Sequence, residues 1–212
     1  MRTKVQMEDS RQHMLDAGWD YFSKDPIESV TMPEIAQTAG VARATLYRYY
    51  NSKAALAIAI ANWKMADLFN EIVIRYPDDM IRNRTAAERF GFYLDAFIDL
   101  YRDHKDLLRF IQFLNIFIRG QDDAPEQIDA YLKVYTEVAA RFHNNVYLLA
   151  QKDGTVRTDI PEEEMFTVMT HLMLAAATRY AMGTVYHPEQ SLSPEDELIL
   201  LKQMILRQYC CV

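Results

Sequence analysis

The chain has 212 residues, of which 50% are apolar and 25% charged. This composition excludes an intrinsically disordered chain and supplies enough apolar side chains for one or two folded domains. No apolar run reaches the roughly 20 residues that a membrane-spanning helix needs. The polar N-terminus lacks the apolar stretch of a signal peptide. The two cysteines are adjacent, at residues 210 and 211, so we expect no structural disulfide and a reducing, cytoplasmic setting.

The net charge of −7 argues at first against a nucleic-acid partner, but the acidic residues are unevenly distributed. Residues 1–64 hold 8 Lys and Arg against 7 Asp and Glu, whereas residues 65–212 hold 15 against 23. The N-terminal part is therefore nearly neutral, and charge alone does not indicate DNA binding.

Apolar residues recur at helical spacing along nearly the whole chain, without strand-like alternation or internal repeats. The predicted fold class is therefore all-α. About nine helices are predicted, at 7–23, 32–38, 42–49, 52–75, 85–102, 105–119, 124–151, 161–183 and 194–209.

Several of these helices begin with a short polar residue that an acid follows three positions later. The polar oxygen accepts a free backbone N–H, and the acid can return a bond to the cap. Proline in the first turn adds to the signal because its missing N–H has no helical partner there. The pairs are Thr31–Glu34, Thr85–Glu88, Asp123–Glu126 and Asp159–Glu162, and Ser193 with Pro194 opens a fifth helix.

Residues 31–53 have the spacing of a helix-turn-helix. Ala36 supplies the small residue where the two helices cross, and Gly40 tolerates the positive φ of the turn. Ile35, Val41 and Leu46 close the pair from inside. An ordinary helical hairpin would use the same small residues. The aromatic hydroxyls and the lysine that follow, at 47–53, favour a helix that enters the major groove of DNA.

The segment from Thr31 to Leu56 resembles the signature of the TetR family of regulators. It reads Thr-x3-Ile-Ala-x2-Ala-Gly-Val and then Leu-Tyr-x-Tyr-Tyr-x2-Lys. The resemblance implies an all-helical homodimer. It would have a helix-turn-helix DNA-binding domain at 1–51 and a helical effector-binding and dimerisation domain at 52–212. Tyr49 and Tyr50 stand where the family often has His and Phe.

The roles of the DNA-facing residues follow from chemistry together with this resemblance. Arg43 is suited to a bidentate contact with guanine, and Thr45 to a thymine methyl group. Arg43 and Ala44 stand where Ser and Gly are frequent in the family, so the operator sequence cannot be taken from a relative. The expected base contacts are Arg43, Ala44, Thr45 and Arg48, and the expected phosphate contacts are Thr31, Tyr47, Tyr49 and Lys53.

The last two predicted helices carry apolar residues at i, i+3 and i+4 spacing. Such stripes also suit the core of a single chain, but the resemblance favours a four-helix interface between two copies. A two-fold dimer reads a palindromic site. The residues expected in the dimer interface are Met165, Met169, Leu172, Ala176, Leu201 and Ile205.

The predicted helices between 85 and 151 are rich in aromatic residues, which are more often core than ligand site. Polar residues interrupt the apolar faces and need partners when buried. Together with the resemblance they predict a small, mostly apolar or aromatic effector, and Arg179 would favour an anionic group. The residues expected to line the effector site are Tyr93, Phe97, Phe113, Asn115, Phe117, Tyr135, His171 and Arg179.

We therefore expect a ligand-responsive transcriptional regulator, a repressor by resemblance, that binds double-stranded operator DNA and is released by its effector. The five histidines are scattered without metal-ligand spacing, and phosphate loops and nucleophile motifs are absent, so no enzyme activity, metal or cofactor is predicted. Two alternatives remain open: a DNA-binding regulator without a small-molecule effector, and a helical adaptor that binds protein. The terminal cysteines are expected in a frayed tail rather than in an oxidant sensor.

Overall fold

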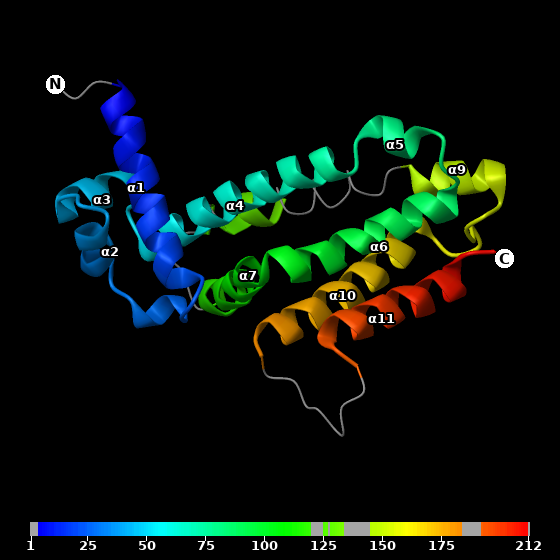
Figure 1. Ribbon diagram of the computed structural model, residues 1–212. Coiled ribbons are helices and arrows are strands. Elements are labelled where there is room, and N and C mark those ends of the chain that lie inside the picture. Colours follow the sequence, from blue (N-terminus) through cyan, green and yellow to red (C-terminus); the bar gives the residue numbers. More distant parts are fainter. Residues whose placement is uncertain (1–3, 120–124, 127, 134–144, 184–191, 212) are drawn as a thin grey trace. The chain divides into compact units, whose positions relative to one another are not determined.

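A computed structural model describes residues 4–119, 125–126, 128–133, 145–183 and 192–211 (Figure 1). The predicted all-α class is confirmed, because these residues form helices joined by short connections. Near the N-terminus lie α1 (Lys4–Phe22), the 3-10 helix η1 (Ile27–Ser29), α2 (Met32–Thr38), α3 (Arg43–Tyr49) and α4 (Lys53–Arg75). Then follow α5 (Asp78–Arg82), α6 (Ala86–Asp103), α7 (Lys105–Ile118), α9 (Val146–Asp153), α10 (Glu162–Ala181) and α11 (Pro194–Tyr209).

Two features of the helix order differ from the sequence prediction. The chain forms the short helix α5 after Pro77, between two predicted helices, where no helix was predicted. The helix predicted over 124–151 is wrong at Asn145, whose φ of 53° is left-handed. A left-handed residue ends helical hydrogen bonding, and Asn is among the few side chains that tolerate it. Helix α9 therefore starts afresh at Val146.

The helix caps follow the predicted pattern in three places. Thr31, Thr85 and Ser193 each accept the backbone N–H three residues on, and the acid at that position returns a bond to the cap. The cap predicted at Asp159 is wrong, because Pro161 occupies the N-cap of α10 and the Asp159 carboxylate pairs with Arg157 at 2.7 Å. The pair Asp123–Glu126 falls partly outside the described residues.

The chain divides into two compact units. Unit 1 comprises Met1–Leu68 and Arg109–Tyr135, and unit 2 comprises Phe69–Leu108 and Thr136–Val212. Helices α4 and α7 contribute residues to both units. This division rests on packing, whereas the boundary predicted after residue 51 concerns function and stays a prediction.

In unit 1, α1 and α4 approach each other closely at Gly18. A Cβ atom at this position would lie 2.6 Å from Cδ1 of Ile60 and 3.5 Å from Cδ2 of Leu56. Both of these α4 side chains are fully buried. Any larger residue here would require the buried Ile60 side chain to shift.

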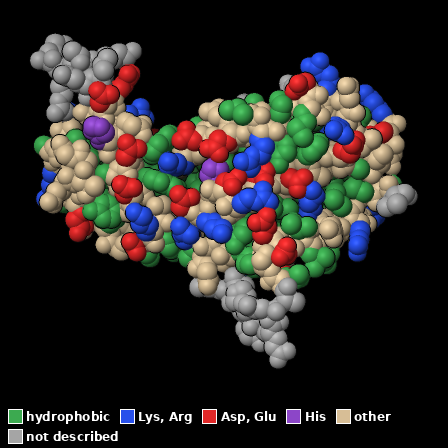
Figure 2. Space-filling model, in the orientation of Figure 1, with side chains coloured by type: hydrophobic (Ala, Val, Ile, Leu, Met, Phe, Trp, Pro, Cys, Tyr) green, Lys and Arg blue, Asp and Glu red, His purple; other side chains and the backbone are tan. Residues whose placement is uncertain are grey.

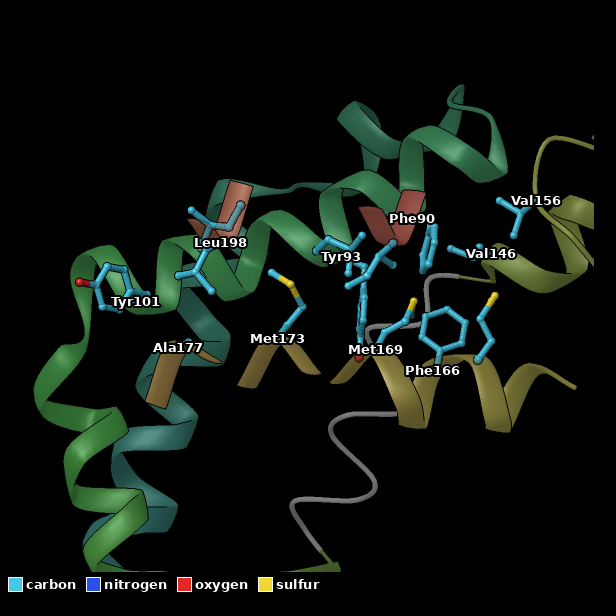
Figure 3. Packing of buried hydrophobic residues seen from close by; sticks show 14 of the residues in the cluster. Phe90, Tyr93, Tyr101, Val146, Val156, Phe166, Met169, Met173, Ala177 and Leu198 are labelled. Carbon is cyan, nitrogen blue, oxygen red and sulfur yellow. The ribbon is translucent and has the colours of Figure 1, made fainter. Parts of the chain in front are cut away.

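The core of unit 2 is built from aromatic and sulfur-containing side chains of α6 and α10 (Figure 3). Phe166 lies edge to face with both Phe90 and Tyr93, at centroid distances of 6.0 and 5.1 Å. Met169 and Met173 continue this row along α10 and are fully buried. Burial of each such side chain contributes about 1.5–3 kcal/mol, so this row holds α10 against α6.

Charged side chains link three helices at the surface of unit 2. Arg75, at the end of α4, pairs with Asp99 and Asp103 of α6 at 2.9 and 2.8 Å. Arg102 of α6 pairs with Asp99 at 2.8 Å and with Glu195 of α11 at 2.6 Å. Acidic and basic side chains are also interspersed across the face drawn in Figure 2. Exposed pairs contribute about 0–1 kcal/mol each, so the network orients helix ends more than it stabilises them.

The C-terminal tail is not frayed, contrary to the expectation from the sequence. The backbone N–H of Arg157 donates to the Tyr209 carbonyl at 2.8 Å, and that of Cys211 donates to the Thr155 carbonyl at 3.0 Å. Cys210 forms an isolated antiparallel bridge with Val156. Burial raises the pKa of the Cys210 thiol, which leaves less of the reactive thiolate.

The tight contact at Gly18 yields a prediction about stability. Gly18→Ala is expected to destabilise the chain by about 1–3 kcal/mol, the usual cost of overpacking a core. Gly91 in α6 is a matched control, because a Cβ there meets nothing within 4 Å. Gly91→Ala is expected to be neutral or stabilising by up to about 1 kcal/mol, because alanine favours the helix. Chemical denaturation of both variants checks the difference, and equal effects would contradict it.

Candidate DNA-binding site

Helices α2 and α3 form a helix-turn-helix whose turn depends on Gly40. This residue has a φ of 64°, and the backbone N–H of Val41 after it donates to the Ala36 carbonyl at 3.0 Å. Ile35 and Ala36 on α2 are buried, as is Leu46 on α3. The buried apolar residues therefore hold the two helices together, as the sequence predicted. Val41 was also expected inside, but it is only partly buried.

The outward face of α3 carries the side chains that the sequence assigned to DNA bases. Arg43, Ala44 and Arg48 are exposed, and Thr45 is partly exposed. Successive residues of a helix are turned by about 100°, so the four positions spread over the side of α3 that lies away from the buried Leu46.

Two aromatic rings support the arginines of α3. The Arg43 guanidinium carbon lies 5.8 Å from the centroid of the Tyr47 ring, and that of Arg48 lies 5.6 Å from the Tyr49 ring. Such cation–π contacts at exposed sites contribute about 0.5–1 kcal/mol. They restrict two long side chains before any ligand is bound, and a bidentate base contact then costs less side-chain entropy.

At the start of α2, a carboxylate of the same helix already accepts hydrogen bonds from the N-cap residue. The Glu34 carboxylate accepts the Thr31 hydroxyl at 2.6 Å and the Thr31 backbone N–H at 2.7 Å. These hydrogen bonds, that of the Thr31 hydroxyl first, lower the pKa of Glu34 and keep its carboxylate charged. A phosphate at Thr31 would therefore meet a negative charge, which the sequence argument for this contact did not weigh.

Lys53 has a structural role that the sequence did not indicate. Its ammonium donates to the carbonyls of Ile27, Glu28 and Val30, at 2.8, 3.3 and 2.9 Å. The same ammonium lies 5.6 Å from the centroid of the Phe117 ring. Burial is the largest cause that lowers the pKa of Lys53. An ammonium has three N–H donors, so all three are engaged in holding the segment that precedes α2.

Two further residues near α3 were not singled out from the sequence. Tyr50 is buried, and its hydroxyl accepts a bond from Arg11 Nε at 3.4 Å. Ser52 accepts the Ala55 backbone N–H at 3.1 Å and so caps the start of α4. A serine directly before a long apolar helix is an N-cap signal that sequence reasoning missed here.

The residues expected to line an effector site are spread over both units. Tyr93 is buried in unit 2, where its hydroxyl bonds to the Thr170 hydroxyl at 2.6 Å, and the Phe97 ring packs against it. His171 and Arg179 are exposed on α10. Asn115 is likewise exposed, Phe113 partly buried and Phe117 buried, all in unit 1, while Tyr135 lies outside the described residues.

The residues expected in the dimer interface need a correction. Met165, Met169 and Ile205 are buried in the core of unit 2, because they face α6 rather than solvent. They have no surface left for a second copy. Leu172 is 48% exposed, while Ala176 and Leu201 are partly buried. The outer faces of the same helices carry other exposed apolar side chains, namely Val168 on α10 and Ile199, Leu200 and Met204 on α11.

Comparison with known proteins agrees with this geometry. Residues 14–60 match the model of bacterial regulatory proteins of the tetR family. This match includes the segment 31–56, whose resemblance to the TetR family was predicted from the sequence. An uncharacterised HTH-type transcriptional regulator of Mycobacterium tuberculosis is 34% identical over 94 residues, covering 44% of this chain and 45% of that protein. The chain thus aligns with less than half the length of this curated relative.

AcrR, an HTH-type transcriptional regulator of Shigella flexneri, is 34% identical over 71 residues, or 34% of this chain and 27% of AcrR. Both relatives are transcriptional regulators, which agrees with the prediction that the chain is not an enzyme. Within the described residues, no helix combines the length and apolarity required to cross a bilayer.

Solved structures extend the likeness in fold to nearly the whole chain. A putative regulator from Saccharomonospora viridis, in complex with choline, has a TM-score of 0.73 at 15% identity and covers 97% of this chain and 100% of its own. FadR from Bacillus subtilis, in complex with stearoyl-CoA, has a TM-score of 0.64 at 18% identity and covers 92% of this chain and 97% of its own. At such low identity the likeness concerns the fold.

The contacts of Lys53 predict a loss of stability when its ammonium is removed. Lys53→Met is expected to lower the free energy of unfolding by about 1–2 kcal/mol, since hydrogen bonds to a charged group contribute about 1.5–3 kcal/mol and this group is partly solvated. The exposed Lys24 provides the control, and Lys24→Met is expected to change little. Thermal or urea denaturation measures both. Equal stability of Lys53→Met and the parent chain would refute the structural role.

Proposed function

We propose that the chain is a transcriptional regulator that binds a palindromic operator as a homodimer and is released from it by a small effector. The observation that carries this proposal is the outward face of α3. This face combines two arginines, each in contact with a tyrosine ring, with small residues. The turn that precedes α3 depends on Gly40. Small neighbours let the helix approach the floor of the major groove, where an arginine reads guanine.

The base and phosphate contacts keep their predicted assignment except at two residues. Arg43, Ala44, Thr45 and Arg48 face the bases. Tyr47, which is 39% exposed, and the partly exposed Tyr49 carry hydroxyls suited to phosphate. Thr31 and Lys53 act instead by holding the start of α2 in place, because their donors are already engaged.

A homodimer accounts for the exposed apolar residues of α10 and α11. Val168 and Leu172 lie one turn apart on α10, and Leu200 and Met204 lie one turn apart on α11. Each is more than 40% exposed. These two helices pack against each other in unit 2, so a second copy could complete a four-helix arrangement that covers them. We define these four side chains as the dimer patch.

An effector is supported by the ligands of proteins that share this fold. Two of these structures are complexes, one with choline and the other with stearoyl-CoA. We propose for this chain a small, mostly apolar or aromatic effector near Tyr93 and Phe97. Its affinity difference between two states of the dimer would set the change in operator affinity, typically about 1–3 kcal/mol. Thermal-shift screening of aromatic and acyl compounds distinguishes this from regulation without a small molecule.

Selection from a random double-stranded DNA pool tests the assignment of α3. The parent chain is expected to enrich one palindrome, and Arg43→Ala to lose about 1–3 kcal/mol at a single base pair of each half-site. Exposed Arg82 on α5 is the control, and Arg82→Ala should enrich the same palindrome with the same affinity. Failure of a verified dimer to enrich any sequence, with and without cell extract, would instead favour the protein-binding adaptor.

The salt dependence of operator binding separates phosphate contacts from structural contacts. Each lost phosphate contact lowers the slope of log affinity against log salt by about 1. Lys53→Met is expected to weaken binding with an unchanged slope, because its ammonium is bonded to carbonyls. A slope that falls by one would return Lys53 to the phosphate contacts that the sequence suggested.

The dimer patch predicts a change of oligomeric state. Leu172→Glu is expected to shift the chain from dimer to monomer in sedimentation, because it places a charge at the centre of an apolar contact. Leu148 on α9 is a matched control: it is 58% exposed and lies outside the patch. Leu148→Glu should remain dimeric. If both variants, or neither, dissociate, the interface lies elsewhere.

A further inference from the structure

The two tryptophans of the chain flank a single ammonium group. Nζ of Lys64 lies 4.5 Å from the centroid of the Trp19 ring and 3.9 Å from that of Trp63. Helix α1 supplies Trp19, and α4 supplies Trp63 and Lys64. All three side chains are partly exposed, so solvent reaches this place in unit 1. We name the two rings the tryptophan pair.

The tryptophan pair lies beside a close contact between α1 and α4. Gly18 lies directly before Trp19, and its missing Cβ brings α1 against Ile60 one turn before Trp63. Trp19 also packs edge to face against Phe110, at a centroid distance of 5.5 Å. The fully buried Phe110 supports this ring from behind. The spacing of the two rings is therefore set by the backbone and the core.

The Lys64 ammonium has the rings as its only direct partners in the described part of the chain. No carboxylate there lies within ion-pair distance of it, and no hydrogen bond from it is found. Lys202, by contrast, donates to Asp95 at 2.5 Å. An ammonium normally keeps water or an acceptor on each N–H. A lysine held by two indole faces is thus in a place better suited to a cation without N–H groups.

We propose that the tryptophan pair is a binding site for a small methylated ammonium compound, and that Lys64 occupies this site in the free chain. Aromatic faces recognise quaternary ammonium groups because these cations are weakly hydrated and lose little on leaving water. The lysine ammonium is strongly hydrated and sits on a flexible stem of four carbons. Lys64 can therefore move into solvent at small cost when a quaternary cation enters.

The surrounding charge favours a cation at this position. Asp16 and Asp20 lie on α1 within one turn of Trp19, and Asp67 follows Lys64 by three residues on α4. All three carboxylates are exposed, so they raise the local cation concentration through long-range attraction without contacting the ligand. The proposed site lies in unit 1 and does not depend on the effector site near Tyr93 in unit 2. It also does not depend on operator binding.

Intrinsic fluorescence tests the proposal directly, because both tryptophans of the chain belong to the site. Tetramethylammonium chloride is titrated into the dimer without DNA, with sodium chloride at equal ionic strength as the reference. A saturable change in emission is expected. Lys64→Met removes the competing charge and is expected to tighten binding by about tenfold. Trp63→Leu is expected to abolish binding, which the emission of the remaining Trp19 would still report.

Two controls make the result specific. Lys105 lies 4.6 Å from the single ring of Tyr101 in unit 2, so Lys105→Met should leave the titration unchanged. Choline should bind, whereas its neutral isostere, with carbon in place of nitrogen, should not. Circular dichroism verifies that each variant is folded. The proposal is overturned if the parent chain gives no saturable change, if the neutral compound acts equally, or if only Lys64→Met binds. None of these outcomes bears on DNA binding.

Discussion

The absence of a side chain at Gly18 is the constraint on which unit 1 depends. It lets α1 lie against Leu56 and Ile60 of α4, where a Cβ atom would come within 2.6 Å of the Ile60 side chain. Helix α2 packs against α1 and α3 against α2, so the direction in which α3 presents Arg43 is set through this chain of contacts. Lys53 completes the arrangement from the first turn of α4, because its ammonium holds the segment before α2. The α3 residues proposed to read DNA are thus positioned by residues outside α3.

Much of this could be read from the sequence, because the signals were local. Helical periodicity and capping pairs such as Thr85–Glu88 depend on residues three or four positions apart, and those helices begin within a residue or so of their predicted starts. The helix-turn-helix was predictable for the same reason: Ala36 and Gly40 act on their immediate neighbours. The exposed face of α3 then follows from its short length and from the burial of Leu46.

The remaining features depend on partners far away in the chain, which spacing does not reveal. Lys53 bonds to carbonyls more than twenty residues earlier. The sequence around Lys53 would be the same whether its ammonium bound these carbonyls or a phosphate. The terminal tail is fixed by the backbone of Thr155 and Arg157. Backbone hydrogen bonds do not depend on residue type, so the sequence does not reveal them. The spacing of apolar residues along a helix does not show which of them face the core. For that reason Met169 and Leu172, three positions apart, have opposite environments.

The charge distribution gives dimerisation a physical role beyond symmetry. Residues 1–64 carry almost no net charge, and the carboxylate of Glu34 faces the start of α2. Long-range electrostatic attraction of this part of the chain to DNA is therefore weak. A single α3 adds only the few kcal/mol of its base contacts. In the proposed dimer, joined through α10 and α11, the second contact would be intramolecular, with an effective concentration far above that of free protein. The proposed operator binding by so acidic a chain therefore depends on the proposed dimer.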